Sequence, residues 1–174
     1  QQKETLLPAI ASGERLVSLA LQEGLHHAPA DIASTAVRDG DDYLVNGCKL
    51  MVLDASSADQ FIVIVRTSGS AGEEQGLSAL LVDADSAGLS IQRRSLVDSR
   101  NAGALSLENV KVPAAKLLGK EGEAWAGLAR TLDIANIGLA AELLGLSAEA
   151  FERTVAYLKE RKQFGKVIGS FQGL

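Results

Sequence analysis

The stretch YLVNGCKLMVL, residues 43–53, decides the fold class. Two apolar, β-rich runs flank the dipeptide Asn46-Gly47, and both of these residue types tolerate the positive φ angles of a tight hairpin turn. The pattern predicts a strand–turn–strand unit with Asn46-Gly47 at its tip and with Tyr43, Val45 and Leu50 on its strands. A helix through this stretch would exclude a β domain here.

Other stretches on the C-terminal side of this one have the same character. Each is short, apolar or alternating, and bounded by Gly, Ser or Pro, which end strands. They are DQFIVIVRT (59–67), LSALLVDAD (77–85), LSIQRR (89–94) and GALSLENVKVP (103–113). Short strands at roughly even spacing predict a small antiparallel β-barrel or sandwich, which we assign to residues 1–118.

The periodicity changes after Gly122 from strand-like to helical. EAWAGLART (123–131) predicts a short helix, and Asp133 is a candidate N-cap for a longer helix that ends near Gln163. Two apolar stripes along this second helix are more than one β domain can cover. We expect residues 119–174 to be the first helices of an incomplete four-helix bundle, with helix 133–163 as the contact surface for other chains. The stripes are Ile137, Ala141, Leu144, Ala148, Phe151, Val155 and Leu158, and Leu139, Leu143, Leu146 and Ala150.

Composition narrows the functional classes. The chain is 47% hydrophobic and 22% charged, as expected for a folded core, and its net charge of −5 argues against nucleic-acid binding. No run approaches the ~20 apolar residues of a transmembrane helix, so no membrane span is expected. Cys48 is the single cysteine, which excludes an intrachain disulfide and favours a reducing, cytoplasmic location. The opening, QQKETLLPAIASGE, lacks the character of a signal peptide.

Three motifs, in order along the chain, resemble those of the acyl-CoA dehydrogenases. GDDYLVNGCKLMV (40–52) is similar to the family's barrel hairpin, LENVKVPAAKLLGKEGEAW (107–125) to its exit from the barrel, and ERKQFGKVIGSFQ (160–172) to its helix-end motif. The resemblance implies a middle β-barrel between an N-terminal helical domain and a C-terminal four-helix bundle that builds a tetramer. The chain would then be a fragment containing the barrel and the first one or two bundle helices.

The same resemblance implies FAD as the cofactor. In the family, the helix-end motif leaves one subunit and grips the adenosine diphosphate part of FAD held mainly by its neighbour. Arg161 would pair with the pyrophosphate, Gln163 and Phe164 would contact the nucleotide, and Gln172 would hydrogen-bond to it. The residues alone also allow a simpler interpretation, in which a basic helix end is favoured by the helix dipole and the phenylalanines pack in the bundle.

On the barrel side, the flavin positions of the family depart from its pattern. Gln22 stands at a threonine position, Ala28 at a serine, Met51 at an aromatic residue and Leu53 at a threonine or serine. Gln22 and Leu53 are therefore candidate cofactor contacts, although an apolar side chain provides no hydrogen bond to tune a ring nitrogen. We expect the chain by itself to carry no FAD.

No catalytic residue can be assigned. The family reaction needs a carboxylate base, and at one of the two family positions for it this chain has Ala135; the other position would lie beyond residue 174. His26-His27 lacks further ligands at metal spacing, so no metal site is expected. Glu142 and Glu149 on the long helix are interpreted as polar positions between the stripes. The arginines at 93, 94 and 100 are interpreted as a solvated basic face.

The resemblance implies an FAD-dependent acyl-CoA dehydrogenase that acts on an acyl-CoA substrate and passes electrons to an electron-transferring flavoprotein, within a homo- or hetero-oligomer. A different class of function stays open, in which the chain is a non-catalytic partner subunit that completes the FAD site of an active neighbour. A flavin monooxygenase or nitroalkane oxidase on the same fold is a third possibility, because a fold does not determine its chemistry.

Overall fold

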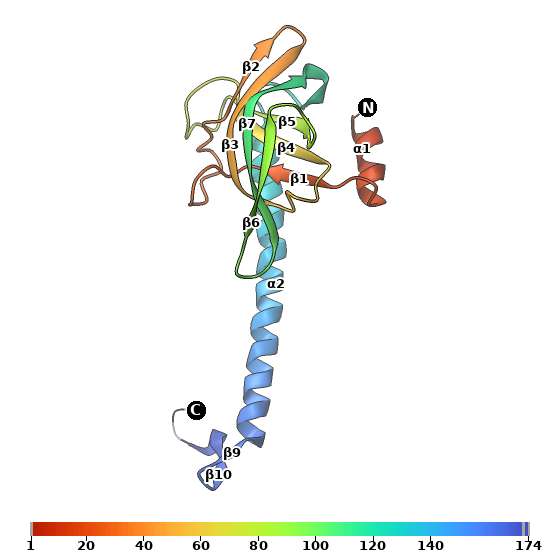
Figure 1. Ribbon diagram of the computed structural model, residues 1–174. Helices are drawn as coiled ribbons and strands as arrows, with labels where there is room; N and C mark the ends of the chain where they lie inside the picture. Colours follow the sequence, from red (N-terminus) through yellow and green to blue (C-terminus); the bar gives the residue numbers. More distant parts are fainter. Residues whose placement is uncertain (1, 172, 174) are drawn as a thin grey trace. The chain divides into compact units, whose positions relative to one another are not determined.

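The computed structural model describes residues 2–171 and 173 of the chain. They divide into two compact units, Gln1–Gly127 and Leu128–Leu174, and each unit is described by itself. The first unit contains a β-sheet domain (Figure 1), and the second contains most of a long helix and a small C-terminal hairpin.

The first unit is a sheet with the strand order β6-β7-β3-β2-β4-β5-β8, in which β1 also pairs with β4. Most neighbours are antiparallel, but β1 and β4 run parallel, so the sheet is mixed. The predicted β domain is confirmed. Its strands are β1 (Val17–Ala20), β2 (Thr35–Asp39), β3 (Asp42–Leu53), β4 (Gln60–Arg66), β5 (Leu77–Asp83), β6 (Leu89–Ser95), β7 (Asn101–Pro113) and β8 (Leu117–Leu118).

The core lies on the inner face of this curved sheet. Alternate residues of β3, β4, β5 and β7 point inward, as the period of two in a strand requires, and they bury large apolar side chains together. Tyr43, Phe61, Leu80 and Leu105 are each at most 1% exposed. The alternation of side chains along these strands therefore determines which residues form the core.

The predicted turn at Asn46-Gly47 is wrong. The hairpin turn lies at Gly40-Asp41, between β2 and β3, and Asn46-Gly47 lies inside β3. The pairing of β3 with β7 shifts register between Val45 and Gly47, and Asn46 bonds across this shift to Asn109, through Oδ1 to the backbone N–H (2.8 Å) and through Nδ2 to the side chain (3.2 Å). The dipeptide is thus part of a β-bulge rather than of a turn.

An N-terminal helix, α1 (Gln2–Ala11), precedes the sheet, although the sequence pattern predicted no element there. Its amphipathic pattern is weak, because Pro8 and several polar residues interrupt the apolar positions. The Gln2 amide Nε2 donates hydrogen bonds to the carbonyl oxygens of Ala115 and Leu117, at 2.7 and 3.0 Å. Contacts that are distant in sequence therefore tie the start of the helix to the segment around β8.

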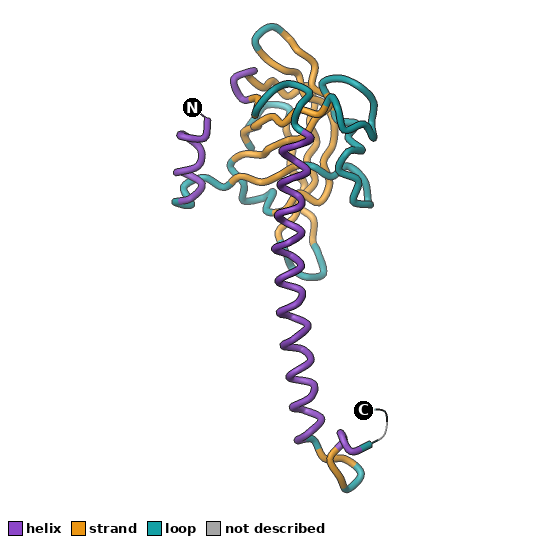
Figure 2. The backbone as a smooth tube through the Cα atoms, turned by 180° about the vertical axis from the view of Figure 1, so that it is seen from behind, coloured by secondary structure: helices purple, strands orange, loops and turns teal. Residues whose placement is uncertain are grey.

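The long helix is α2 (Trp125–Glu160), continuous from end to end (Figure 2). The prediction of two helices, with Asp133 as the cap of the second, is wrong, and so is the expected end near Gln163. Asp133 lies inside the helix, where the Ala, Leu and Ile residues on both sides propagate it without a break. By length and composition alone α2 would also qualify as a membrane-spanning helix, a weak criterion that helices packed in bundles meet as well.

Both apolar stripes of α2 lie on its surface in this chain. Leu144 and Phe151 are 73% and 69% exposed, and Leu158 is half-buried. The remaining large members of the two stripes that are exposed are Ile137, Leu139, Leu143 and Leu146. The helix therefore presents a long apolar surface that the chain itself leaves uncovered.

The end of the second unit folds back as a small hairpin. Strands β9 (Lys162–Gln163) and β10 (Lys166–Val167) pair around Phe164-Gly165, which have φ angles of 53° and 81°. Two consecutive positive φ angles are the signature of the tight turn that joins two-residue hairpins. A short 3-10 helix, η2 (Ile168–Ser170), follows.

Candidate functional site

The first unit has a groove of about 500 Å³ between β1 and the end of β3. Gln22, Met51 and Leu53, which the sequence resemblance places at flavin contacts, all line it. The structure therefore brings both candidate barrel-side residues, Gln22 and Leu53, to one surface. The other lining residues come from the start of β1, from the segment after it and from the turn after β3: Leu16, Val17, Ser18, Leu19, Leu21, Leu50, Asp54, Ser57 and Ala58.

The groove offers few hydrogen-bonding side chains at the predicted flavin positions. Met51 and Leu53 are 46% and 52% exposed and carry no donor. The Gln22 amide Nε2 already donates to the Gly24 carbonyl oxygen at 3.0 Å. Ala28 is exposed and lies outside the groove lining. A flat ring could pack on this surface, but the residues do not fit the hydrogen bonding that a flavin ring receives from the family's barrel.

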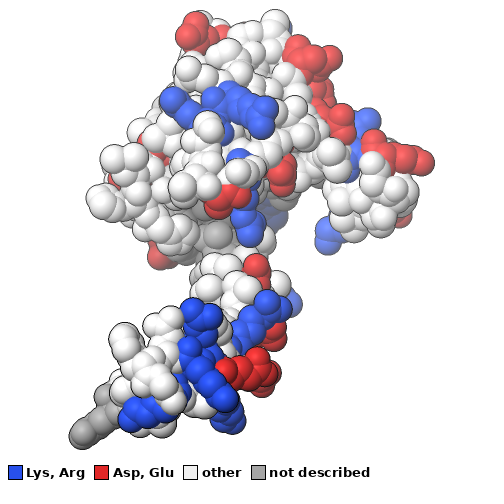
Figure 3. Space-filling model, turned by 60° about the horizontal axis from the view of Figure 1, so that its bottom comes forward, with Lys and Arg blue, Asp and Glu red and all other residues white. Residues whose placement is uncertain are grey.

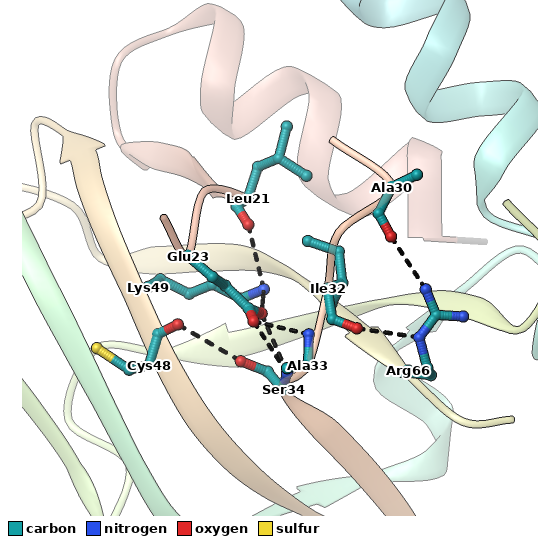
Figure 4. Close-up of polar contacts among 9 residues, drawn as sticks. All are labelled: Leu21, Glu23, Ala30, Ile32, Ala33, Ser34, Cys48, Lys49 and Arg66. Carbon is teal, nitrogen blue, oxygen red and sulfur yellow. Dashed lines mark hydrogen bonds and ion pairs between the residues drawn. The ribbon is translucent and has the colours of Figure 1, made fainter. Parts of the chain in front are cut away.

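A buried ion pair (Figure 4) is formed by Glu23 and Lys49, which are next in sequence to the groove-lining residues Gln22 and Leu50. The Lys49 side chain is fully buried, and its Nζ lies 2.5 Å from Glu23 Oε1 and 3.2 Å from the Leu21 carbonyl oxygen. The Glu23 carboxylate also accepts hydrogen bonds from the backbone N–H groups of Ala33 (2.7 Å) and Ser34 (3.1 Å). Three separate segments of the chain thus meet at this pair.

The environment shifts the pKa of both partners. Burial alone would raise the pKa of Glu23, but the charge of Lys49 and the hydrogen bonds from Lys49, Ser34 and Ala33 outweigh it, so the pKa of Glu23 lies below its ordinary value. Burial lowers the pKa of Lys49, and the charge of Glu23 opposes that change. The short contact between the two groups fits an ion pair with both partners charged at neutral pH.

Arg66 anchors the same loop from its other side. Its guanidinium, 6% exposed, donates to the carbonyl oxygens of Ile32 (3.0 Å) and Ala30 (3.1 Å), as Figure 4 shows. It also donates to carbonyl oxygens of the loop after β4, those of Ser68, Glu73 and Gln75. A single buried cation therefore fastens two loops to the end of β4.

The sequence analysis did not single out Glu23, Lys49 or Arg66. The sequence did contain a signal for Lys49 and Arg66, because each is a charged residue within or at the end of a largely apolar strand segment. A buried charge needs a partner or several hydrogen bonds, so such a position predicts a polar network. The partners come from the loop between β1 and β2 and, for Arg66, also from the loop after β4, and the sequence pattern does not reveal them.

The second predicted site, the C-terminal hairpin, lies in the second unit. Phe164 is 90% exposed at the tip of the turn, and its ring meets that of Phe171 edge-on with 6.3 Å between centroids. Lys166 Nζ lies 4.2 Å above the Phe171 ring. Arg161 and Gln163 are exposed on the same hairpin, whereas Gln172 lies outside the described residues.

Basic side chains gather at this end of the chain (Figure 3). They are the exposed residues Arg153, Lys159, Arg161, Lys162 and Lys166. An exposed aromatic ring beside guanidinium and ammonium groups can stack on a nucleotide base and pair with its phosphates. The hairpin therefore carries the residue types that would hold the adenosine diphosphate part of FAD, whereas the groove of the first unit does not fit the hydrogen bonding of the ring.

The structure places the base position on α2. Ala135 is exposed on this helix in the second unit, and its methyl group cannot take a proton. His26 and His27 are exposed in the loop between β1 and β2. Among residues 2–171 and 173, no group of three or more His, Cys, Asp and Glu side chains is arranged to hold a metal ion.

Comparison with protein families defines the class. The model of the acyl-CoA dehydrogenase middle domain matches residues 22–110, and that of the acyl-CoA dehydrogenase C-terminal domain matches residues 122–174. The chain therefore belongs to the acyl-CoA dehydrogenase family. Its sheet domain and the helix that follows correspond to the family's middle domain and the start of its C-terminal helical domain.

Individual relatives agree with this assignment. The chain is 34% identical to a short-chain specific acyl-CoA dehydrogenase of Clostridium acetobutylicum and 33% identical to the CarC subunit of a caffeyl-CoA reductase–Etf complex of Acetobacterium woodii. Each match covers 100% of this chain and 47% of the relative. The chain thus spans about half the length of these curated relatives.

Two solved structures show the same fold. The acyl-CoA dehydrogenase of Geobacillus kaustophilus superposes with a TM-score of 0.89 at 32% identity, over 98% of this chain and 46% of that one. A chain of the ChsE4–ChsE5 complex of Mycobacterium tuberculosis superposes with a TM-score of 0.70 at 32% identity, over 76% of this chain and 34% of that one.

Proposed function

We propose that this protein works in an FAD-dependent acyl-CoA dehydrogenase, which introduces a double bond between Cα and Cβ of an acyl-CoA thioester. The observation that carries the proposal is the C-terminal hairpin, which presents Phe164 and Arg161 at the position of the family's FAD-gripping motif. Family membership and the CoA thioester chemistry named for the relatives support the substrate class.

In this proposal, the residues of the chain bind and orient the cofactor. Arg161 would pair with the pyrophosphate through its planar guanidinium, while Phe164 and Gln163 would contact the nucleotide. When bound, FAD would supply the acceptor for the hydride of the β-carbon. The groove with Met51 and Leu53 would offer apolar packing to one side of the ring.

A second candidate is a non-catalytic subunit that completes the FAD site of an active partner chain. Two specific observations favour it. Met51 and Leu53 give the groove no hydrogen-bond donors at the flavin positions, and Ala135 cannot act as a base. The nucleotide-binding hairpin nevertheless keeps its arginine and its exposed phenylalanine. A chain that contributes only its hairpin to the FAD site of a neighbouring subunit is expected to lose the flavin-ring contacts of its own barrel and to keep the nucleotide contacts of the hairpin.

Electron transfer and location extend the proposal. The relative from Acetobacterium is named as a subunit of a complex with Etf, and we propose an electron-transferring flavoprotein as the electron acceptor here. The single cysteine, Cys48, supports a reducing, cytoplasmic location.

The experiment that tests the proposal uses the assembly that contains this chain, purified through a tag on it. Denaturation followed by flavin absorbance gives the amount of FAD per copy, and dye reduction with a panel of acyl-CoAs gives the activity. One FAD per copy together with acyl-CoA-dependent dye reduction would support the dehydrogenase. One FAD for every two chains of the assembly, counting both kinds of chain, with every active site assigned to the other kind, would support the partner subunit. An assembly without flavin would contradict both candidates.

A further inference from the structure

The groove of the first unit has two walls that come from different parts of the chain. One wall is Leu21-Gln22, just after β1, and the other is Leu50-Met51, near the end of β3. The walls touch directly at one backbone hydrogen bond, in which the Leu50 N–H donates to the Gln22 carbonyl oxygen at 2.6 Å. The shape of the groove therefore depends on how these two segments are held against each other.

The buried ion pair lies one residue away from each wall. Glu23 directly follows Gln22, and Lys49 directly precedes Leu50. Lys49 Nζ bridges the two sides, because it lies 2.5 Å from Glu23 Oε1 and also donates to the Leu21 carbonyl oxygen at 3.2 Å. The pair thus closes a ring of polar contacts around the one backbone hydrogen bond between the walls.

We infer that the Glu23–Lys49 ion pair is a positioning device, which fixes the register of the two groove walls and so sets the shape of the surface on which a flat ring can pack. Glu23 and Lys49 are accordingly positioning residues and do not touch the ligand. The inference rests on the proposed function only for the identity of that ligand, the flavin ring.

The ion pair can contribute little to the stability of the fold and still fix the relative positions of the segments that it joins. A buried ion pair loses about as much in desolvation as it gains in attraction, and an apolar pair of similar volume is often equally stable. An apolar pair, however, has no directional bonds. Glu23 accepts hydrogen bonds from the N–H groups of Ala33 and Ser34 as well as from Lys49, so its carboxylate defines the relative positions of three segments. Hydrocarbon side chains would fill the same space without defining them.

The loop between β1 and β2 shows why such a device is needed. Arg66 holds this loop at Ala30 and Ile32, near its end, and Glu23 holds it at Ala33 and Ser34. Residues 24–28, which lie between Glu23 and Ala30 and include Leu25, are exposed. Without the ion pair, nothing at Glu23 would anchor the chain between the exposed part of the loop and Gln22, so a movement of the loop would displace this wall of the groove.

The test is the double variant Glu23→Leu/Lys49→Leu. The matched control is Asp42→Leu/Lys111→Leu, which removes a more exposed ion pair between β3 and β7, with 3.1 Å between Lys111 Nζ and Asp42 Oδ2. Amide hydrogen exchange is followed residue by residue by NMR in the purified chain. We expect the amides of Leu50, Ala33 and Ser34 to exchange at least about tenfold faster in the double variant, while the amides of the central strands β4 and β5 and the urea midpoint stay unchanged. The control variant is expected to leave these three amides unchanged.

Two results would overturn the inference. Unchanged exchange at Leu50, Ala33 and Ser34 would show that the pair does not position the walls, and a uniform increase over the whole sheet would show that it only stabilises the fold. Glu23→Gln, which keeps the shape of the side chain, guards against misfolding of the double variant; it should speed exchange at the same three amides, although its urea midpoint falls as well because Lys49 is left without its charged partner. FAD affinity of the complete assembly is measured in parallel. If the wild-type assembly binds no FAD, the proposed function fails, while the exchange data still decide the positioning role.

Discussion

Gly47 and Ser34 lie so close together that no side chain fits between them. A Cβ atom built on Gly47 would lie 2.1 Å from Ser34 Oγ and 2.7 Å from Ser34 Cα, and the backbone at Gly47 has a φ of +148°. The contact brings β3 against the residue that precedes β2, where the Ser34 backbone N–H donates a hydrogen bond to Glu23 Oε1 and the Ser34 hydroxyl donates one to the Cys48 carbonyl oxygen. Glycine is required here by a close approach rather than by a turn.

Replacement of this glycine should therefore be severe. We expect Gly47→Ala to lower the free energy of unfolding by about 3 kcal/mol, because the new methyl group overlaps both the side chain and the backbone of Ser34. Gly40→Ala is the matched control: its φ is also positive, but its Cβ would meet nothing within 4 Å, so only the conformational cost of about 1 kcal/mol is expected. Urea unfolding measures both values, and equal losses would contradict the close-approach explanation.

Arg66→Met should destabilise the first unit through its loops. The substitution keeps an apolar stem but leaves several carbonyl oxygens without their donor, and we expect a loss of about 3 kcal/mol in the free energy of unfolding. Arg94→Met, at an exposed position of β6, should change it by less than about 0.5 kcal/mol. Limited proteolysis should cut the loop after β4 faster in Arg66→Met alone. A variant as stable and as resistant as the wild type would show that the loops do not depend on the guanidinium.

The stability of the fold should depend on pH through Glu23. Its pKa in the folded chain lies below the ordinary value of 4.5, so its ion pair contributes stability that is present above pH 4.5 and is lost as the pH falls through the folded pKa. We expect the difference in unfolding free energy between the wild type and Glu23→Gln to be largest near pH 7 and to shrink below pH 4.5. Urea titrations at several pH values measure this difference. Glu74→Gln, at an exposed position, is the control, and a pH-independent difference for Glu23→Gln would refute the role of its charge.

Arg161 should matter for FAD retention in the complete assembly. Loss of a charge-assisted pair with the pyrophosphate costs roughly 1.5–3 kcal/mol, so Arg161→Ala should weaken FAD binding about ten- to a hundredfold. Arg100→Ala removes an arginine that is also exposed but belongs to the first unit, outside the helix-end motif, and should leave FAD binding unchanged. Flavin absorbance after gel filtration compares the two variants. Equal flavin content would remove the C-terminal hairpin from the site.

The apolar surface of α2 should drive association. We expect the scattering mass of the wild type to rise above the 18.2 kDa of one chain with increasing concentration, because monomers seldom expose so much contiguous apolar surface. Leu144→Glu/Phe151→Glu should shift the mass back towards one chain. Ala156→Glu, which adds a charge outside both stripes, should not. A wild type that stays monomeric at high concentration would contradict the assignment of helix 133–163 as the contact surface.

Local patterns in the sequence determined much of the fold. Apolar runs bounded by turn residues predicted the stretches that form β4, β5, β6 and β7, because such runs are typical of short strands. The motif at the chain end predicted FAD contacts for Arg161 and Phe164, which stay a prediction, and the structure shows Phe164 exposed at the tip of a hairpin. The uncovered stripes of α2 also followed from spacing alone.

Tertiary structure alone decided how these parts are used. Asn46-Gly47 forms a bulge rather than a turn because Asn109 and Ser34, distant in sequence, supply the hydrogen bonds and the close contact. Met51 and Leu53 meet Gln22 in one groove because β1 and β3 lie side by side, and no local pattern encodes that pairing. The same holds for the Glu23–Lys49 pair: each charge is visible in the sequence, but its partner is chosen by the fold, since burying one charge requires the other within reach.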